Sequence, residues 1–212
     1  MTFSPKKKIQ PSIMDDQKMN KIQTLIEEIK KLEKELLVEI EKKEEEFFYK
    51  IKGKKIFFEE EAKKYQKKFH VNLSSYLIHA SFLNMITFPI IWFCLIPAIC
   101  MDFSATFYQM ICFPIYGIPK VKRSEYIIND RHSLQYLNII EKLNCTYCGY
   151  FNGLLAYIQE IAARTEQYWC PIKHARKLAA IHSRYHKFLE YGDCKDYQDK
   201  LAALRKDFID LQ

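Results

Sequence analysis

Glycine and proline are scarce in this chain, with five and seven residues among 212. Because tight turns depend on these two residue types, a fold built from many β-hairpins is excluded. The seven cysteines are an odd number, which argues against a closed set of disulfides and favours reduced thiols in a reducing compartment. The expected fold class is therefore all-α.

Motifs that mark common enzyme classes are also missing. The chain has no phosphate-binding loop pattern, no dinucleotide fingerprint and no serine nucleophile elbow. Its basic residues do not alternate with aromatic ones, so no nucleic-acid partner is expected. Its first seventy residues are strongly charged, so no cleaved signal peptide is expected. No reaction is predicted from these patterns.

Formal charge is absent from most of the middle of the chain, residues 71–119. Residues 71–101 are 31 uncharged residues and residues 103–119 are 17 more, with Asp102 between them. Since one crossing needs about 20 apolar residues, this stretch is long enough for two. We expect a two-span transmembrane hairpin, Ser75–Ile96 and Cys100–Ile118, that turns at Pro97 and leaves Asp102 solvated near the far interface. A single span with an interfacial second half is the alternative.

Both flanks of this uncharged stretch are basic. Positive residues in short flanks stay on the cytoplasmic side, so two basic flanks predict an even number of crossings. The expected location is the bacterial cytoplasmic membrane, with both termini in the cytoplasm and the lipid bilayer as a partner. The flanking basic residues are Lys63, Lys64, Lys67 and Lys68 on one side and Lys120, Lys122 and Arg123 on the other.

Residues 1–70 are expected to form a charged helical arm. Within residues 17–51, apolar residues recur at alternating spacings of three and four, which is the pattern of a coiled-coil seam. About three heptads suffice for weak self-association, so we predict a homo-oligomer through residues 17–51. A solvated amphipathic helix that folds back on its own chain is the alternative. The seam residues are Ile22, Leu25, Ile29, Leu32 and Leu36.

Residues 120–212 are expected to form a small cytoplasmic helical bundle. Apolar periodicity predicts four short helices, near residues 134–143, 150–169, 172–190 and 197–211, the first of them capped by Asp130 or Ser133. Glu160 and Arg164 fall opposite the apolar stripe of the second helix, and we expect them to form a solvated ion pair.

Four residues of this domain have the spacing of a metal site. Cys145, Cys148, Cys170 and His174 read as C-x2-C-x21-C-x3-H, which suits a structural zinc or iron site. A single helix over residues 150–169 would be about 30 Å long and would separate the two pairs. One ion could then bind all four only through a break near Asn152 and Gly153 or through a partner chain.

A thiol-redox function is the alternative to metal binding. A C-x-x-C just before a helix places thiols at the positive end of the helix dipole, which favours thiolate and disulfide exchange. The stretch from Asn144 to Asn152 resembles the active-site helix start of alkylhydroperoxidase-like, carboxymuconolactone decarboxylase-type proteins. The resemblance implies a redox pair of Cys145 and Cys148, but Asn152 stands where that family has a proton-relaying histidine.

Over residues 102–193 the chain resembles uncharacterised bacterial membrane proteins with no assigned activity. The resemblance implies a membrane setting and no functional residue. We therefore expect a membrane-anchored protein that presents a Cys/His domain for interaction or assembly. The resemblance depends on Gln109, residues 112–114, residues 116–119, Asp130-Arg131, the C-x-x-C and the run from Glu160 to His174.

Overall fold

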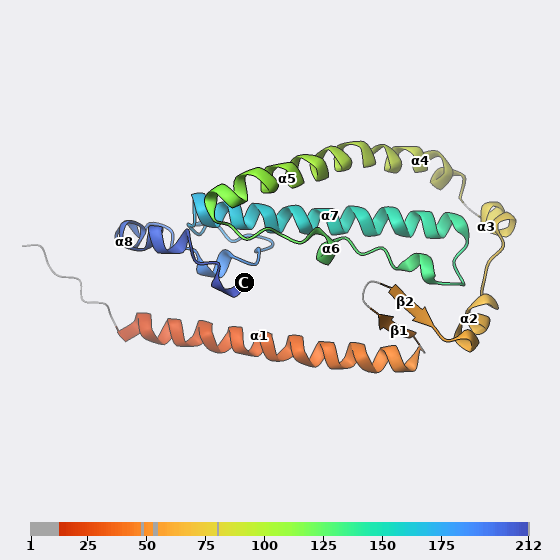
Figure 1. Ribbon diagram of the computed structural model, residues 1–212, viewed down its shortest axis with the longest axis horizontal. Coiled ribbons are helices and arrows are strands. Elements are labelled where there is room, and N and C mark those ends of the chain that lie inside the picture. Colours follow the sequence, from red (N-terminus) through yellow and green to blue (C-terminus); the bar gives the residue numbers. More distant parts are fainter. Residues whose placement is uncertain (1–12, 48, 53–54, 80, 212) are drawn as a thin grey trace, which may run out of the picture. The chain divides into compact units, whose positions relative to one another are not determined.

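The computed structural model describes residues 13–47, 49–52, 55–79 and 81–211 of the chain. These residues divide into two compact units, Met1–Tyr65 and Gln66–Gln212. Helices dominate both (Figure 1), which confirms the all-α class expected from the sequence. The uncharged stretch and the expected carboxy-terminal bundle both belong to the second unit.

The first unit is a long helix followed by a small hairpin. Helix α1 spans Ile13–Glu46, and strands β1 (Tyr49–Lys52) and β2 (Lys55–Phe58) pair in antiparallel register. Tyr49 lies opposite Phe58, with ring centroids 5.7 Å apart. Cross-strand aromatic pairs of this kind stabilise a two-stranded ribbon. The described part of the first unit is therefore helical except for this hairpin.

Three helices lead into and through the uncharged stretch after α2 (Glu60–Lys67). They are α3 (Leu73–His79), α4 (Phe82–Phe93) and α5 (Leu95–Tyr116). Only Cys94 separates α4 from α5, and its backbone stays in the right-handed helical region at φ −62° and ψ −15°. The two helices therefore continue in nearly one direction, and Met85–Tyr116 is a single candidate membrane span among the described residues.

The predicted two-span hairpin is therefore wrong. Pro97 has no N–H to bond the carbonyl of Phe93, so the helical hydrogen bonding breaks there. Pro97 is nevertheless the third residue of α5, within a first turn whose N–H groups have no helical partner anyway. A chain reversal needs a non-helical loop, and the chain makes none at Cys94. The reversal comes at Gly117, whose positive φ of 69° caps α5.

After Gly117 the chain runs back as an extended segment, residues 118–138, beside α5 and α7 (Figure 1). The segment includes α6 (Arg123–Tyr126) and the 3-10 turn η1 (Arg131–Ser133). It lies close to α7 at Gly153, where an added Cβ would come within 2.5 Å of the Tyr126 carbonyl oxygen. Glycine is therefore required there by the close approach of another backbone.

Helix α7 spans Ile139–Trp169 without a break. Asn138 and Glu141 form a capping box at its start, where the Asn138 side chain accepts from the Glu141 N–H and the Glu141 carboxylate accepts from the Asn138 N–H. The two helices expected at residues 134–143 and 150–169 are thus largely one helix. Its cap is Asn138 and not Asp130 or Ser133.

The last forty residues contain less helix than the sequence predicts. Residues 170–193, where a helix was expected up to Glu190, are irregular except for the 3-10 turn η2. A short isolated bridge joins Ile172 to Leu189. The expected four-helix bundle is therefore replaced by one long helix with short elements packed at its end. Those elements are η2 (Tyr185–Lys187), α8 (Cys194–Leu204) and η3 (Ile209–Leu211).

The core of the second unit lies between α5 and α7, which run parallel because the extended segment returns the chain between them. Tyr147 of α7 contacts Trp92 of α4 just before the start of α5, with tilted rings whose centroids are 5.3 Å apart. Tyr116 of α5 stacks on Tyr168 at the other end, at 4.8 Å. The buried side chains between these ends come from α5, α7, the extended segment and the carboxy-terminal residues. They include Phe113, Val121, Leu154, Tyr157 and Phe208.

Candidate functional site

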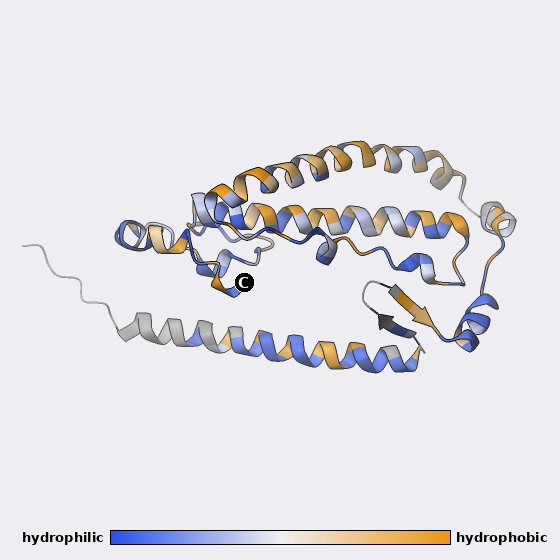
Figure 2. Ribbon diagram, in the orientation of Figure 1, coloured by the Kyte–Doolittle hydropathy of each residue, from blue (hydrophilic) through white to orange (hydrophobic). Residues whose placement is uncertain are grey.

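Helix α4 and helix α5 expose an unusually apolar surface, which we call the apolar face. Figure 2 shows hydrophobic residues concentrated along these two helices. Only 6% of the most apolar 18-residue stretch within Met85–Tyr116 is buried. Water-soluble monomers seldom expose apolar patches beyond about 300–600 Å². The face comprises Phe82, Leu83, Met85, Ile86, Phe88, Ile90, Ile91, Phe93, Ile96, Ile99, Met101, Phe103, Phe107, Met110, Ile111 and Ile115.

Polar side chains on these helices bond back to their own backbone. The Thr87 hydroxyl donates to the Leu83 carbonyl at 3.0 Å, and the Cys94 thiol lies 3.8 Å from the Ile90 carbonyl. Such bonds satisfy a polar side chain without water. The face therefore carries few groups that would lose hydrogen bonds on leaving water.

Asp102 lies in the middle of α5 and is not at a turn, which corrects its expected place. Its carboxylate accepts from Arg123 Nη2 at 2.6 Å and from Arg123 Nε at 3.1 Å, a bidentate ion pair. The Tyr150 hydroxyl donates to the same carboxylate at 3.0 Å. The Asp102 side chain is only 13% exposed. This acid therefore ties α5 to the extended segment and to α7.

A second polar connection joins the same three elements two turns further along α5. The Gln109 side chain accepts from the Val121 N–H at 3.0 Å and donates to the Val121 carbonyl at 3.3 Å. It also donates to the Tyr157 hydroxyl, which lies 3.3 Å from Thr106 Oγ1. The Gln109 side chain thus makes the two hydrogen bonds with the Val121 backbone that a neighbouring β-strand would otherwise make. The segment is bonded to both helices along its course.

The outer side of the extended segment is charged. The Lys122 and Glu125 side chains are 78% and 61% exposed and form an ion pair at 3.4 Å. Lys120, Arg123 and Arg131 are exposed as well. The α5–α7 pair therefore has the apolar face on one surface and a charged segment, residues 120–131, on another.

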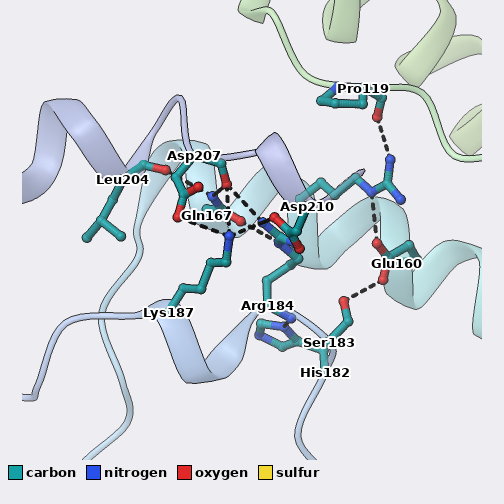
Figure 3. Close-up of polar contacts among 11 residues, drawn as sticks. Pro119, Glu160, Gln167, His182, Ser183, Arg184, Lys187, Leu204, Asp207 and Asp210 are labelled. Atoms are coloured by element: carbon teal, nitrogen blue, oxygen red, sulfur yellow. Dashed lines mark hydrogen bonds and ion pairs between the residues drawn. The ribbon is translucent and has the colours of Figure 1, made fainter. Parts of the chain in front are cut away.

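Glu160 and Arg164 are buried, which corrects the expectation of a solvated pair. Their side chains are 9% and 8% exposed and are joined by a 2.8 Å ion pair (Figure 3). Arg164 also donates to the Pro119 carbonyl at 2.7 Å, and the Ser183 hydroxyl donates to Glu160 at 2.5 Å. A buried pair needs such additional partners to offset desolvation. The pair holds the start of the extended segment and the 170–193 region against α7.

A larger polar cluster lies beside this pair around Arg184, whose side chain is 2% exposed (Figure 3). Arg184 donates to Gln167 Oε1 at 2.6 Å, to the Asp207 carbonyl at 2.9 Å and to the Asp210 carboxylate. Lys187 Nζ lies 2.7 Å from Asp210. The hydrogen bond from Arg184 holds the pKa of Asp210 well below its usual range. These bonds join η2 and the carboxy-terminal residues to α7, so the cluster holds the end of the chain on this helix.

The structure does not bring the four predicted metal ligands together within one chain. Cys145 and Cys148 lie in the first third of α7, whereas Cys170 is its carboxy-terminal cap. The 22 helical steps from Cys148 to Cys170 correspond to about 33 Å. The helix is continuous through Asn152 and Gly153, so the break that could have reunited the pairs does not occur. Zinc or iron binding through these residues stays a prediction that requires a second chain.

The predicted redox pair also has a different setting from the expected one. Cys145 and Cys148 lie in the second and third turns of α7, whose first residue is Ile139. The effect of a helix dipole is confined to the first turn, so it does not act on these thiols. Asn152 donates to the Cys148 carbonyl at 2.9 Å. The redox function remains a prediction without its expected geometric support.

His174 belongs to the irregular region and lies apart from the cysteines of α7. Its ring stacks on Tyr185 with 6.5 Å between ring centroids, and its backbone N–H donates to the Tyr185 hydroxyl at 3.0 Å. It lines an open pocket of about 490 Å³ with residues 175–179, Ile181 and Tyr185. Among the described residues, no three His, Cys, Asp or Glu side chains are grouped so that they could hold a metal ion.

Comparison with known proteins supplied no relative. No family model, no curated protein and no solved structure matches the chain. The functional proposal therefore depends on the apolar face and the charged segment themselves.

Proposed function

We propose that the chain is a membrane-associated protein that uses the apolar face of α4 and α5 to hold its second unit on a lipid bilayer. The observation that carries this proposal is the exposure of sixteen large apolar side chains along these helices. Phe103 and Ile115, for example, are 72% and 73% exposed. Burying one such side chain in an apolar medium contributes about 1.5–3 kcal/mol.

On this proposal the membrane-bound unit is presented for interaction or assembly. The carboxy-terminal residues are fastened to α7 by the Arg184 cluster, so the unit would be carried as one rigid piece. The expected setting is the cytoplasmic face of a bacterial membrane, because both flanks of the uncharged stretch are basic.

The proposed self-association would use α1. Its seam residues Leu25, Ile29, Leu32 and Leu36 are all exposed in the single chain. A second copy of α1 could cover them by coiled-coil packing. The thiol and metal functions have no comparable observation in their favour.

Vesicle flotation tests the membrane proposal. We expect the chain to float with vesicles of phosphatidylethanolamine and phosphatidylglycerol. Phe103→Glu and Ile115→Glu each remove an apolar side chain from the face and add a charge to it. Each should weaken binding by roughly 10–100-fold, which corresponds to about 1.5–3 kcal/mol.

Ile209→Glu is the matched control, because Ile209 is 78% exposed but lies in η3, outside the apolar face. This variant should bind vesicles as the parent chain does. Equal losses in all three variants would mean that the apolar face has no special part in binding. A parent chain that does not float would contradict the proposal directly.

A further inference from the structure

We propose that α4 and α5 lie along the membrane surface, with the apolar face in the lipid and the charged segment in water, and do not cross the bilayer. This inference rests on the proposed membrane association and specifies its geometry. It follows from three features of the second unit, which are the depth of the charged segment, the sign of the flanks and the length of the apolar helices.

The charged segment is level with the middle of the α5–α7 pair. The carbonyl of Tyr126 lies against Gly153, which is one residue from the midpoint of α7. Arg123 is bonded to Asp102, seven residues into α5 and fourteen before its end. The exposed Lys122 and Glu125 side chains flank these positions. If the helix pair crossed a bilayer, these charges would lie deep in the hydrocarbon, where ionised side chains and irregular backbone are strongly disfavoured.

An orientation along the surface removes this conflict. The segment packs against both helices of the α5–α7 pair, because it contacts Gln109 of α5 as well as Gly149 and Gly153 of α7. Arg123 is bonded to Asp102 of α5, whereas Lys120, Lys122, Glu125 and Arg131 are exposed. Between Lys142 and Glu160, helix α7 itself carries no formal charge. The pair can therefore meet lipid on one surface and water on the other, as interfacial helices do.

The two basic flanks agree with this orientation. A single crossing would place one basic flank on each side of the membrane, against the preference of lysine and arginine for the cytoplasmic side. The two basic flanks require an even number of crossings, and the described residues contain one candidate span, which is too few for two crossings. The number of crossings is zero if the helix lies in the interface. Both flanks then face the same anionic lipid surface, which attracts lysine.

The length of the apolar helices fits the same orientation. Met85–Tyr116 has 32 residues, which correspond to about 48 Å of helix. The hydrocarbon core is about 30 Å thick, so a crossing would leave several apolar turns outside it. A helix in the interface has no such limit. Apolar side chains along the whole length of α4 and α5 can then reach lipid.

Sidedness of labelling tests the proposal on the unaltered chain. Inverted membrane vesicles from a bacterial expression host are treated with a membrane-impermeant amine reagent, either while sealed or after freeze–thaw loading of the reagent on both sides. Mass spectrometry then compares Lys64 and Lys67 with Lys120 and Lys122. We expect both flanks to be labelled equally in sealed and loaded vesicles. An impermeant maleimide should leave Cys100, in the middle of the face, unlabelled in both.

Two results would overturn the proposal. A crossing helix would show loss of labelling at one flank in sealed vesicles, and its recovery after loading. A two-span hairpin would keep the flanks equal but would expose Cys100 to reagent from the lumen only. A chain that is absent from the vesicles before labelling would instead contradict the membrane association itself, so the two failures are distinguishable.

Discussion

A few buried polar side chains join distant parts of the second unit through hydrogen bonds and ion pairs. Arg184, Gln167 and Glu160 are buried and bonded to groups far away in the sequence, such as Asp207 and Ser183. Losing one partner of a buried charged group is costly, because the other is left without hydrogen bonds. These residues therefore control whether the carboxy-terminal residues stay on α7.

Asp210 offers a pH-dependent test of this fastening. Its pKa is lowered in the folded chain by the hydrogen bond from Arg184. The folded state therefore binds a proton less readily than the unfolded state, in which the pKa of an aspartate is about 3.9. The stabilisation is fully present above that pH and is lost as the pH falls further. Asp210→Asn should lower the urea midpoint at neutral pH, and the difference from the parent chain should shrink below about pH 4.

Asp199→Asn, at an exposed position of α8, is the control and should leave the midpoint unchanged. A difference between Asp210→Asn and the parent chain that stays constant across the acid range would show that the Asp210 charge contributes nothing. The sequence could not have indicated this cluster, because Arg184 and Asp210 are 26 residues apart and share no periodic pattern.

Helices and their breaks were only partly predictable from the sequence. Helix in the uncharged stretch and an amphipathic helix over residues 150–169 were expected, because apolar periodicity and charge are local properties. The joining of residues 139–169 into one helix was missed, although Asn138 and Glu141 carry the spacing of a capping box. The hairpin failed because Pro97 was taken as a turn, whereas its first-turn position lets the helix direction continue. The irregular 170–193 region depends on contacts with α7 that no local pattern encodes.

The close packing of the extended segment on α7 can be tested by adding a methyl group to either of two glycines of α7, Gly149 and Gly153. A Cβ at position 153 would lie 2.5 Å from the Tyr126 carbonyl oxygen and 2.9 Å from Ile127 Cα. At position 149 the nearest atom would be the Ile128 carbonyl oxygen at 3.2 Å. Both Gly→Ala changes gain about 1 kcal/mol of helix propensity. Gly153→Ala should nevertheless destabilise the chain by about 1–3 kcal/mol through overpacking.

Thermal unfolding followed by circular dichroism compares the two variants. Gly149→Ala should retain a melting temperature close to that of the parent chain, because its neighbour needs to shift by only a few tenths of an ångström. If Gly153→Ala melted at or above the temperature of Gly149→Ala, the extended segment would not pack on α7 as described.

The second unit as a whole has two unlike surfaces. One carries the apolar face of α4 and α5, and another carries the charged residues of the segment 120–131. Both the apolar stretch and the charged stretch could be predicted from the sequence, because the presence or absence of charged residues is read from it directly. It did not reveal that the charged segment lies alongside the apolar helices. That arrangement depends on the Asp102–Arg123 pair and on the contacts of Gln109 and Gly153, which join distant parts of the chain.

Photo-crosslinking to lipid tests the central claim most directly. The chain is bound to vesicles that contain a lipid with a photoreactive group in its acyl chain, irradiated, and mapped by mass spectrometry. We predict crosslinks at residues of the apolar face, between Phe82 and Ile115, and none within residues 120–131 or 170–193. Crosslinks concentrated in the charged segment, or a bound chain without crosslinks on α4 and α5, would contradict the account.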